Sequence, residues 1–140
     1  MATFGDLDAL ARALPGVDAA LGRNGRPEYR VGGRAFAFLR PPRKDAMDPD
    51  TGAPMDDVIV LRTPGLEAKE ALLADATLPL FTTPHFNGWP GVLLRERDLE
   101  RVPRERLAAL LEAAWEAVAP RKLVPERVLA RQRAREGGQR

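Results

Sequence analysis

Two adjacent glycines, Gly32 and Gly33, divide two short stretches in which the side chains alternate in character. Apolar and charged residues alternate over residues 28–31, and alanines alternate with phenylalanines over residues 35–38. Alternation at every second residue is typical of a β-strand, and two glycines supply the positive φ angles of a tight hairpin turn. Because strands joined by so short a turn run antiparallel, we expect an antiparallel sheet in the fold.

Three stretches have the pattern of amphipathic helices. In residues 103–120, apolar residues recur at three- and four-residue intervals, namely Leu107, Leu110, Leu111, Ala114, Trp115 and Val118. A helix over residues 4–14 is expected near the start of the chain, where Thr3 and Asp6 form a weak capping box. The third helix is expected to begin at Pro64, with Thr63 as its N-cap, and to continue to about residue 76.

The rest of the chain supplies further strands and a long loop. Residues 57–62, DVIVLR, form a short β-branched run that predicts a third strand. The preceding residues 41–56 are rich in Pro, Gly and Asp, which is typical of a loop. Residues 78–95 are interpreted as a second hairpin around Asn87-Gly88, with residues 92–94 as its most strand-like part.

These elements follow the order α-β-β-β-α-β-β-α, which predicts a two-layer α+β domain with an antiparallel sheet. The chain has 140 residues, enough for one domain. We place this domain at residues 1–124 and expect a basic C-terminal tail, partly helical or disordered, over residues 125–140.

The composition excludes several classes of protein. There are no cysteines, so disulfides and thiolate chemistry are excluded and the best zinc ligands are missing. The opening MATFGDLDAL lacks the charged and apolar regions of a secretory signal, and no apolar run approaches the length of a membrane span. We therefore expect a cytoplasmic protein that does not contact membranes.

The net charge of +2 is unevenly distributed. Residues 23–44 carry seven basic residues and one acidic residue, and residues 120–140 carry seven basic and two acidic residues. The body between them, residues 45–119, carries fourteen acidic and seven basic residues. Basic segments of this kind bind phosphate groups in nucleic-acid-binding proteins, and also occur as solvated sheet faces or tails.

No motif in the chain predicts catalysis. Phosphate-binding and dinucleotide-binding glycine patterns, zinc spacings and nucleophile elbows are all missing. The aspartates of DAMDPDTGAPMDD lack the ligand spacing of a calcium loop. His85, the only histidine, lies in TTPHFNGWPG without a nearby Ser or Asp to complete a catalytic arrangement. We therefore expect no enzyme, no cofactor and no metal, and interpret TTPHFNGWPG first as a structural hairpin and second as a ligand site.

The order of the elements, the VGGRAFAF hairpin, the FTTPHFNGWPGVLL segment and the LAALLEAAWEAVAPRKL helix resemble the MmcQ/YjbR family. The resemblance covers nearly all of residues 3–124. It implies an α+β domain with antiparallel strands, and DNA binding through two strand pairs that project like wings. It supplies no catalytic motif that can be transferred residue by residue.

The sequence is compatible with three functions. The first is a non-enzymatic domain that binds DNA mainly through phosphate contacts, with these candidate residues: Arg26, Arg30, Arg34, Arg40, Arg43, Lys44, His85, Asn87, Trp89, Arg121, Lys122, Arg127 and Arg131. The second is a protein-interaction module, either a homodimer or a binder of another polypeptide, since the order of elements also resembles that of secretion-chaperone-like domains. The third is a small-molecule site around His85, Asn87 and Trp89.

Overall fold

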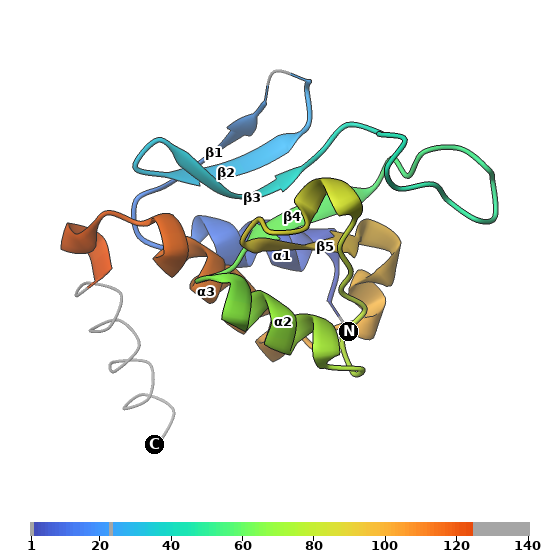
Figure 1. The fold of residues 1–140 in the computed structure, drawn as a ribbon. Helices are drawn as coiled ribbons and strands as arrows, with labels where there is room; N and C mark the ends of the chain where they lie inside the picture. The colour runs from blue at the N-terminus through green and yellow to red at the C-terminus, as the bar shows by residue number, and fades with distance from the viewer. Residues whose placement is uncertain (1, 23, 125–140) are drawn as a thin grey trace.

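The computed structural model describes residues 2–22 and 24–124. Figure 1 shows a sheet with helices packed beneath it. In chain order, the elements are α1 (Phe4–Arg12), β1 (Val17–Leu21), β2 (Pro27–Val31), β3 (Arg34–Leu39), β4 (Val58–Arg62), α2 (Leu66–Ala74), the 3-10 helix η1 (Pro84–Phe86), β5 (Gly91–Arg95), the 3-10 helix η2 (Glu96–Arg101), α3 (Arg104–Val118) and the 3-10 helix η3 (Arg121–Leu123).

The five strands form one sheet in the order β1-β2-β3-β4-β5, and every neighbouring pair is antiparallel. The helices α1, α2 and α3 cover one face of this sheet, which leaves an outer face on the opposite side (Figure 1). The fold is therefore a two-layer α+β domain, as the sequence predicts. None of the helices in the described part of the chain is long and apolar enough to cross a membrane.

The main core lies between the sheet and the helices. The side chains of Leu107, Leu111 and Trp115 on α3 are buried there, together with Ile59 and Leu61 of β4. Each such side chain contributes about 1.5–3 kcal/mol through removal from water. The Trp115 indole also donates a hydrogen bond of 2.9 Å to the carbonyl oxygen of Pro15, which fixes the chain after α1 against α3.

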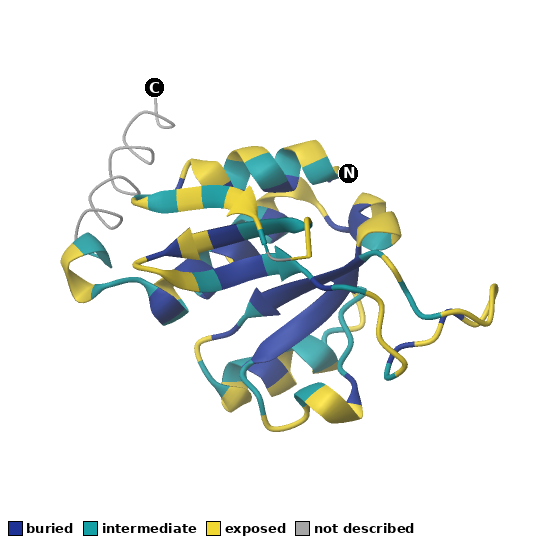
Figure 2. Cartoon of the chain, turned by 90° about the horizontal axis from the view of Figure 1, so that it is seen from above, coloured by how far each residue is buried: buried dark blue, intermediate teal, exposed yellow. Residues whose placement is uncertain are grey.

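A second, smaller apolar cluster lies on the outer face. Val58, Val60 and Leu93 form its buried centre, and the partly buried residues packed on it are Phe38, Met55, Phe81, Phe86 and Trp89. The strands β4 and β5 are thus covered on both faces, whereas β1 is largely exposed (Figure 2). This explains why DVIVLR is a continuous apolar run rather than an alternating one.

The Gly32-Gly33 hairpin is confirmed, with φ values of 58° and 78° at the two glycines. Its alternation is interrupted, because the pairing of β2 with β3 shifts register between Tyr29 and Arg30. The shift places Phe36 in the helix-side core and Phe38 against the outer cluster, so the two phenylalanines do not share a face.

Two expected features are wrong in detail. The strand β1 was not expected, because the sequence VDAAL is short and only partly apolar. The helix α2 begins at Leu66 with Gly65 as its N-cap, not at Pro64 after Thr63. In the chain order, β1 therefore adds a strand before the predicted hairpin.

The predicted second hairpin is reduced to one bridge, in which Phe81 and Leu93 exchange backbone hydrogen bonds of 2.9 and 3.0 Å. Between them the chain forms η1 and a turn, and Asn87 has a φ of −62° rather than a left-handed value. Only Gly88 of the Asn-Gly pair has positive φ, at 81°.

Candidate functional site

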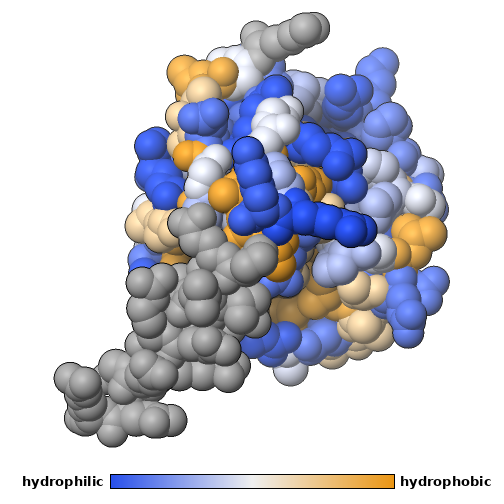
Figure 3. All heavy atoms as spheres, turned by 90° about the vertical axis from the view of Figure 1, so that its left-hand side faces the viewer, coloured by the Kyte–Doolittle hydropathy of each residue, from blue (hydrophilic) through white to orange (hydrophobic). Residues whose placement is uncertain are grey.

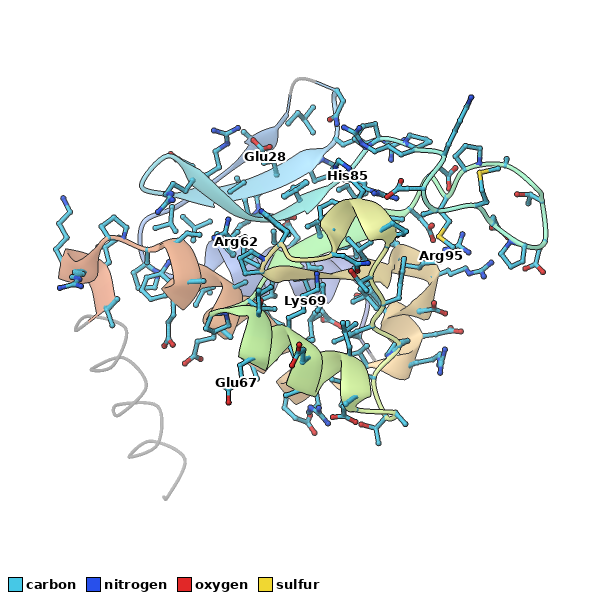
Figure 4. All side chains as sticks on the ribbon, in the orientation of Figure 1. Glu28, Arg62, Glu67, Lys69, His85 and Arg95 are labelled. Atoms are coloured by element: carbon cyan, nitrogen blue, oxygen red, sulfur yellow. The ribbon has the colours of Figure 1, made fainter. Side chains whose placement is uncertain are left out.

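A depression of about 370 Å³ lies on the outer face of the sheet. It is bounded by the turn between β1 and β2, by the outer sides of β2 and β3, by the start of the loop after β3, and by η1. Its lining residues are Gly22, Asn24, Arg26, Glu28, Arg30, Phe38, Leu39, Arg40, Pro41, Arg43, His85 and Phe86. We call this surface the basic cleft. In Figure 4, Glu28 and His85 lie on the side of the sheet away from α2.

From the described residues, the basic cleft gathers four arginines and the histidine, which come from separate stretches of the chain. Arg26 comes from the turn after β1, Arg30 from β2, Arg40 and Arg43 from the loop after β3, and His85 from η1. One acidic residue, Glu28, accepts a hydrogen bond from the Nε of Arg30 and offsets part of this charge. The remaining excess of positive charge favours an anionic ligand.

Arg40 lies beneath the surface of the cleft, with only 2 % of its area exposed. Its Nη1 donates to Oδ2 of Asp45 at 3.0 Å, and the same oxygen accepts a hydrogen bond of 2.7 Å from Thr83. The guanidinium carbon lies 5.5 Å from the centre of the Phe86 ring, in a cation–π arrangement. Arg40 therefore joins the loop after β3 to the segment that carries His85.

Two consequences follow from this arrangement. The hydrogen bond from Arg40 is the main reason that the pKa of Asp45 is lowered from its ordinary value, so the carboxylate stays charged. The Nε and Nη2 atoms of Arg40 are buried and have no hydrogen-bond partner among the described residues. The guanidinium thus retains donor capacity next to the cleft.

The TTPHFNGWPG segment is held in place by backbone turns and by a buried lysine. The amides of Phe86 and Asn87 donate to the carbonyl of Thr83 at 2.9 and 3.0 Å, which forms η1. Lys69 of α2 is 4 % exposed, and its Nζ donates to the carbonyls of Phe86 and Trp89 at 2.6 and 2.8 Å. Burial lowers the pKa of Lys69. Its ammonium group therefore links the two carbonyls from the buried side of the loop.

Trp89 belongs to this support and not to the cleft. Its ring packs on the outer apolar cluster, lies at 5.0 Å from the guanidinium carbon of Arg62, and meets the Phe86 ring edge-on. The indole also covers Gly91 so closely that a Cβ atom there would lie 2.0 Å from the ring. Within the segment, His85 is exposed and lines the cleft, and Asn87 is exposed but lines a different hollow beside Lys69.

The other candidate residues are distributed outside the cleft. Arg34 is exposed at the hairpin turn, and Lys44 is exposed in the loop after β3. Arg121 and Lys122 belong to η3, which follows Pro120, a residue that packs on Gly32 at the end of the sheet. Figure 3 shows the side of the molecule on which η3 lies, where hydrophilic side chains project from the surface. The candidates Arg127 and Arg131 lie outside the described residues.

The carboxylates of the acidic loop after β3 form ion pairs with arginines. Arg95 is buried and bonds Asp48 and Asp57, each at 2.9 Å. The hydrogen bond from Arg95 is the main cause of the lowered pKa of Asp48. In the described part of the chain, no three metal-ligating side chains come together. These carboxylates therefore serve to hold the loop against β5.

Sequence reasoning missed several residues of the cleft, namely Gly22, Asn24, Glu28, Phe38, Leu39 and Pro41. Asn24 carries a usable signal, since an Asn-Gly pair marks a turn that brings neighbouring side chains together. Phe38 could not be assigned to the outer face, because the register shift that places it there has no local signature.

Comparisons with known proteins give a consistent result. A family model described as YjbR matches residues 12–117. The chain is 34 % identical over 128 residues to a protein of Mycobacterium bovis, and equally to a protein of Mycobacterium tuberculosis. Each alignment covers 89 % of this chain and 94 % of the relative, and both relatives are described as uncharacterized proteins.

Proposed function

The chain belongs to the YjbR family, and we propose that it binds nucleic acid, with the basic cleft as the surface that receives the phosphate groups. One observation carries this proposal. Arg26, Arg30, Arg43 and His85 come from four separate stretches of the chain and line a single depression on the outer face. Cations gathered on one surface release the counterions of a phosphate backbone together, which is the main source of affinity in this class of protein.

The side chains of the cleft have different accessibility. The side chain of Arg30 is 49 % exposed, and Arg43 and His85 are also exposed, so these three can donate hydrogen bonds to phosphate directly. Arg26 is half-buried and donates to the carbonyl of Asp56 at 2.6 Å, which leaves its other donors for a ligand. Arg40 is buried and acts as a support. Contacts of this kind position a nucleic acid without reading its sequence.

The test is fluorescence anisotropy with labelled single-stranded and duplex DNA over a series of salt concentrations. The double variant Arg30→Glu with Arg43→Glu is compared with Arg101→Glu combined with Arg104→Glu, which changes the charge equally at exposed arginines outside the cleft. Each lost phosphate contact reduces the log–log salt slope by about 0.7–0.9.

We expect the cleft variant to bind more weakly and with a slope smaller by about 1–2. The control variant should keep most of the slope, since its charges lie away from the ligand. The absence of saturable binding by the unaltered protein at low salt would overturn the proposal. Equal losses in the two variants would show that only the net charge matters.

A second candidate function is supported by the exposed edge of β1. Within residues 2–22 and 24–124, this strand has only β2 as a neighbour in the sheet, and Leu21 at its end is 69 % exposed. An unpaired edge is a template for pairing with another strand, so a homodimer joined through β1 is the form of the protein-interaction hypothesis that the fold favours. Light scattering after size exclusion tests this candidate, because a dimer that Leu21→Lys converts to a monomer supports it and a monomeric parent protein contradicts it.

A further inference from the structure

The basic cleft has an apolar floor that phosphate contacts do not use. Phe38, Pro41 and Phe86 line the depression between the cations. Phe38 and Phe86 are half-buried in the outer apolar cluster, so their positions are fixed by packing. A floor of this kind gains free energy when a flat apolar group covers it and excludes water.

Polar groups suited to the edge of a base lie at one end of the same cleft. Asn24 accepts a hydrogen bond from the amide of Arg26 through Oδ1, which orients its side chain and leaves the amide NH₂ as a donor. The Glu28 carboxylate is 20 % exposed and is oriented by Arg30. A carboxylate in a cationic cleft weakens phosphate binding, and it gives the cleft a strong hydrogen-bond acceptor for the edge of a base.

The size of the cleft limits what can fill it. A volume of about 370 Å³ is at the lower end of the range for small-ligand pockets, and matches a unit of about one nucleotide better than a long groove. A base-paired duplex presents phosphates outward and keeps its bases stacked inside, so it would leave the apolar floor empty. A single strand can turn one base out and cover the floor while its phosphates meet the cations.

Resting on the proposed function, we infer that the ligand is single-stranded nucleic acid and that one unstacked base occupies the cleft. The face of the base covers Phe38 and Pro41, and its edge meets Asn24 and Glu28. The flanking phosphates meet Arg26, Arg43 and His85 at the rim. Because a carboxylate accepts from the exocyclic amino group of cytosine, a base that carries such a group is preferred over thymine.

Two variants test the base site without removing a cation. Gly22 lines the cleft, and a Cβ atom there would lie 3.4 Å from Oε1 of Glu28 and 3.6 Å from Oδ1 of Asn24. The variant Gly22→Leu therefore fills the end of the cleft that receives the edge of the base. Its matched control is Ala9→Leu, which adds bulk at an exposed position of α1. Glu28→Gln removes the charged acceptor while it keeps the shape of the side chain.

The probes are a duplex, an oligo(dT) strand and an oligo(dC) strand of equal length, measured by anisotropy at one salt concentration. We expect the single strands to bind about tenfold more tightly than the duplex, which is the gain from one stacked base. Gly22→Leu should bring single-strand binding down to the level of the duplex. Glu28→Gln should remove the preference for oligo(dC) over oligo(dT), and Ala9→Leu should alter neither ratio. Thermal unfolding verifies that each variant is folded.

The outcomes separate this inference from the proposed function. If the duplex binds as tightly as the strands, or if Gly22→Leu leaves the difference intact, the base site is overturned and phosphate binding by the cleft stands. If cytidine monophosphate displaces the strand at the same concentration as an oligonucleotide, the ligand is a free nucleotide. The inference of a single-stranded ligand is then overturned. If no probe binds, both proposals fail together.

Discussion

At the scale of single residues, Arg40 links the chemistry of the cleft to the stability of the fold. Among the cleft arginines that the structure describes, it alone is buried, and it contacts both Asp45 and the ring of Phe86. Arg30 makes the same type of ion pair, with Glu28, but 49 % of its side chain is exposed. The same pairing chemistry should therefore have different energetic consequences at these two positions, because an exposed pair is screened by water.

Arg40→Met should lower the free energy of unfolding by about 2 kcal/mol, since it leaves the half-buried carboxylate of Asp45 without its cation. Arg30→Met should cost at most about 0.5 kcal/mol, because its pair is at the surface. Urea denaturation measures both changes. Adding Asp45→Asn to Arg40→Met should recover part of the loss, and strict additivity of the two single changes would contradict the coupling.

A second residue-scale prediction concerns pH. Hydrogen bonds from Thr77 and Arg106 lower the pKa of Asp75 to about 2. Because the folded pKa lies below the ordinary value of 3.8, Asp75 stabilises the fold above about pH 4, and this contribution is lost as the pH falls toward 2. Asp75→Asn should therefore be less stable than the parent protein at pH 7, with a difference that shrinks between pH 4 and pH 2. Urea midpoints over this range measure it, and a constant difference would contradict the assignment.

At the scale of elements, the TTPHFNGWPG segment shows how a loop is shaped by contacts from a distance. Lys69 on α2 donates to two of its carbonyls, and Arg62 on β4 packs on its tryptophan. The local sequence alone favours an Asn-Gly hairpin turn, so the sequence prediction was wrong here. By contrast, the Gly32-Gly33 hairpin and the capping box of α1 depend only on neighbouring residues, and both could be predicted.

The close packing of Trp89 on Gly91 leads to a prediction for this element. Gly91→Ala should destabilise the protein by about 1–3 kcal/mol, because the added methyl group needs space that the indole ring occupies. Gly5→Ala in the first turn of α1 is the matched control and should raise the stability, since alanine is the better helix former and its nearest neighbour lies 3.6 Å away. Thermal unfolding measures both variants, and a neutral Gly91→Ala would contradict the packing of the tryptophan.

At the scale of the whole molecule, charge is segregated along the chain. The acidic segment 45–119 supplies α2, α3 and β5, and the basic segment 23–44 supplies β2, β3 and most of the cleft. The fold class could be predicted from the sequence, and so could the basic segment that supplies most of the cleft. The sequence could not predict that His85 joins this segment in the cleft, because that depends on how η1 sits over β3, which ends 45 residues before η1 begins.

The measurement that tests the account most directly uses the fact that His85 is the only histidine. Its ring gives a single Hε1 resonance in an NMR spectrum, from a side chain at the edge of the basic cleft. During titration with single-stranded DNA, we expect this resonance to shift and to saturate together with the anisotropy signal, and to return when salt is added. Saturable binding that leaves the His85 resonance unmoved would place the nucleic acid elsewhere and contradict the assignment of the cleft.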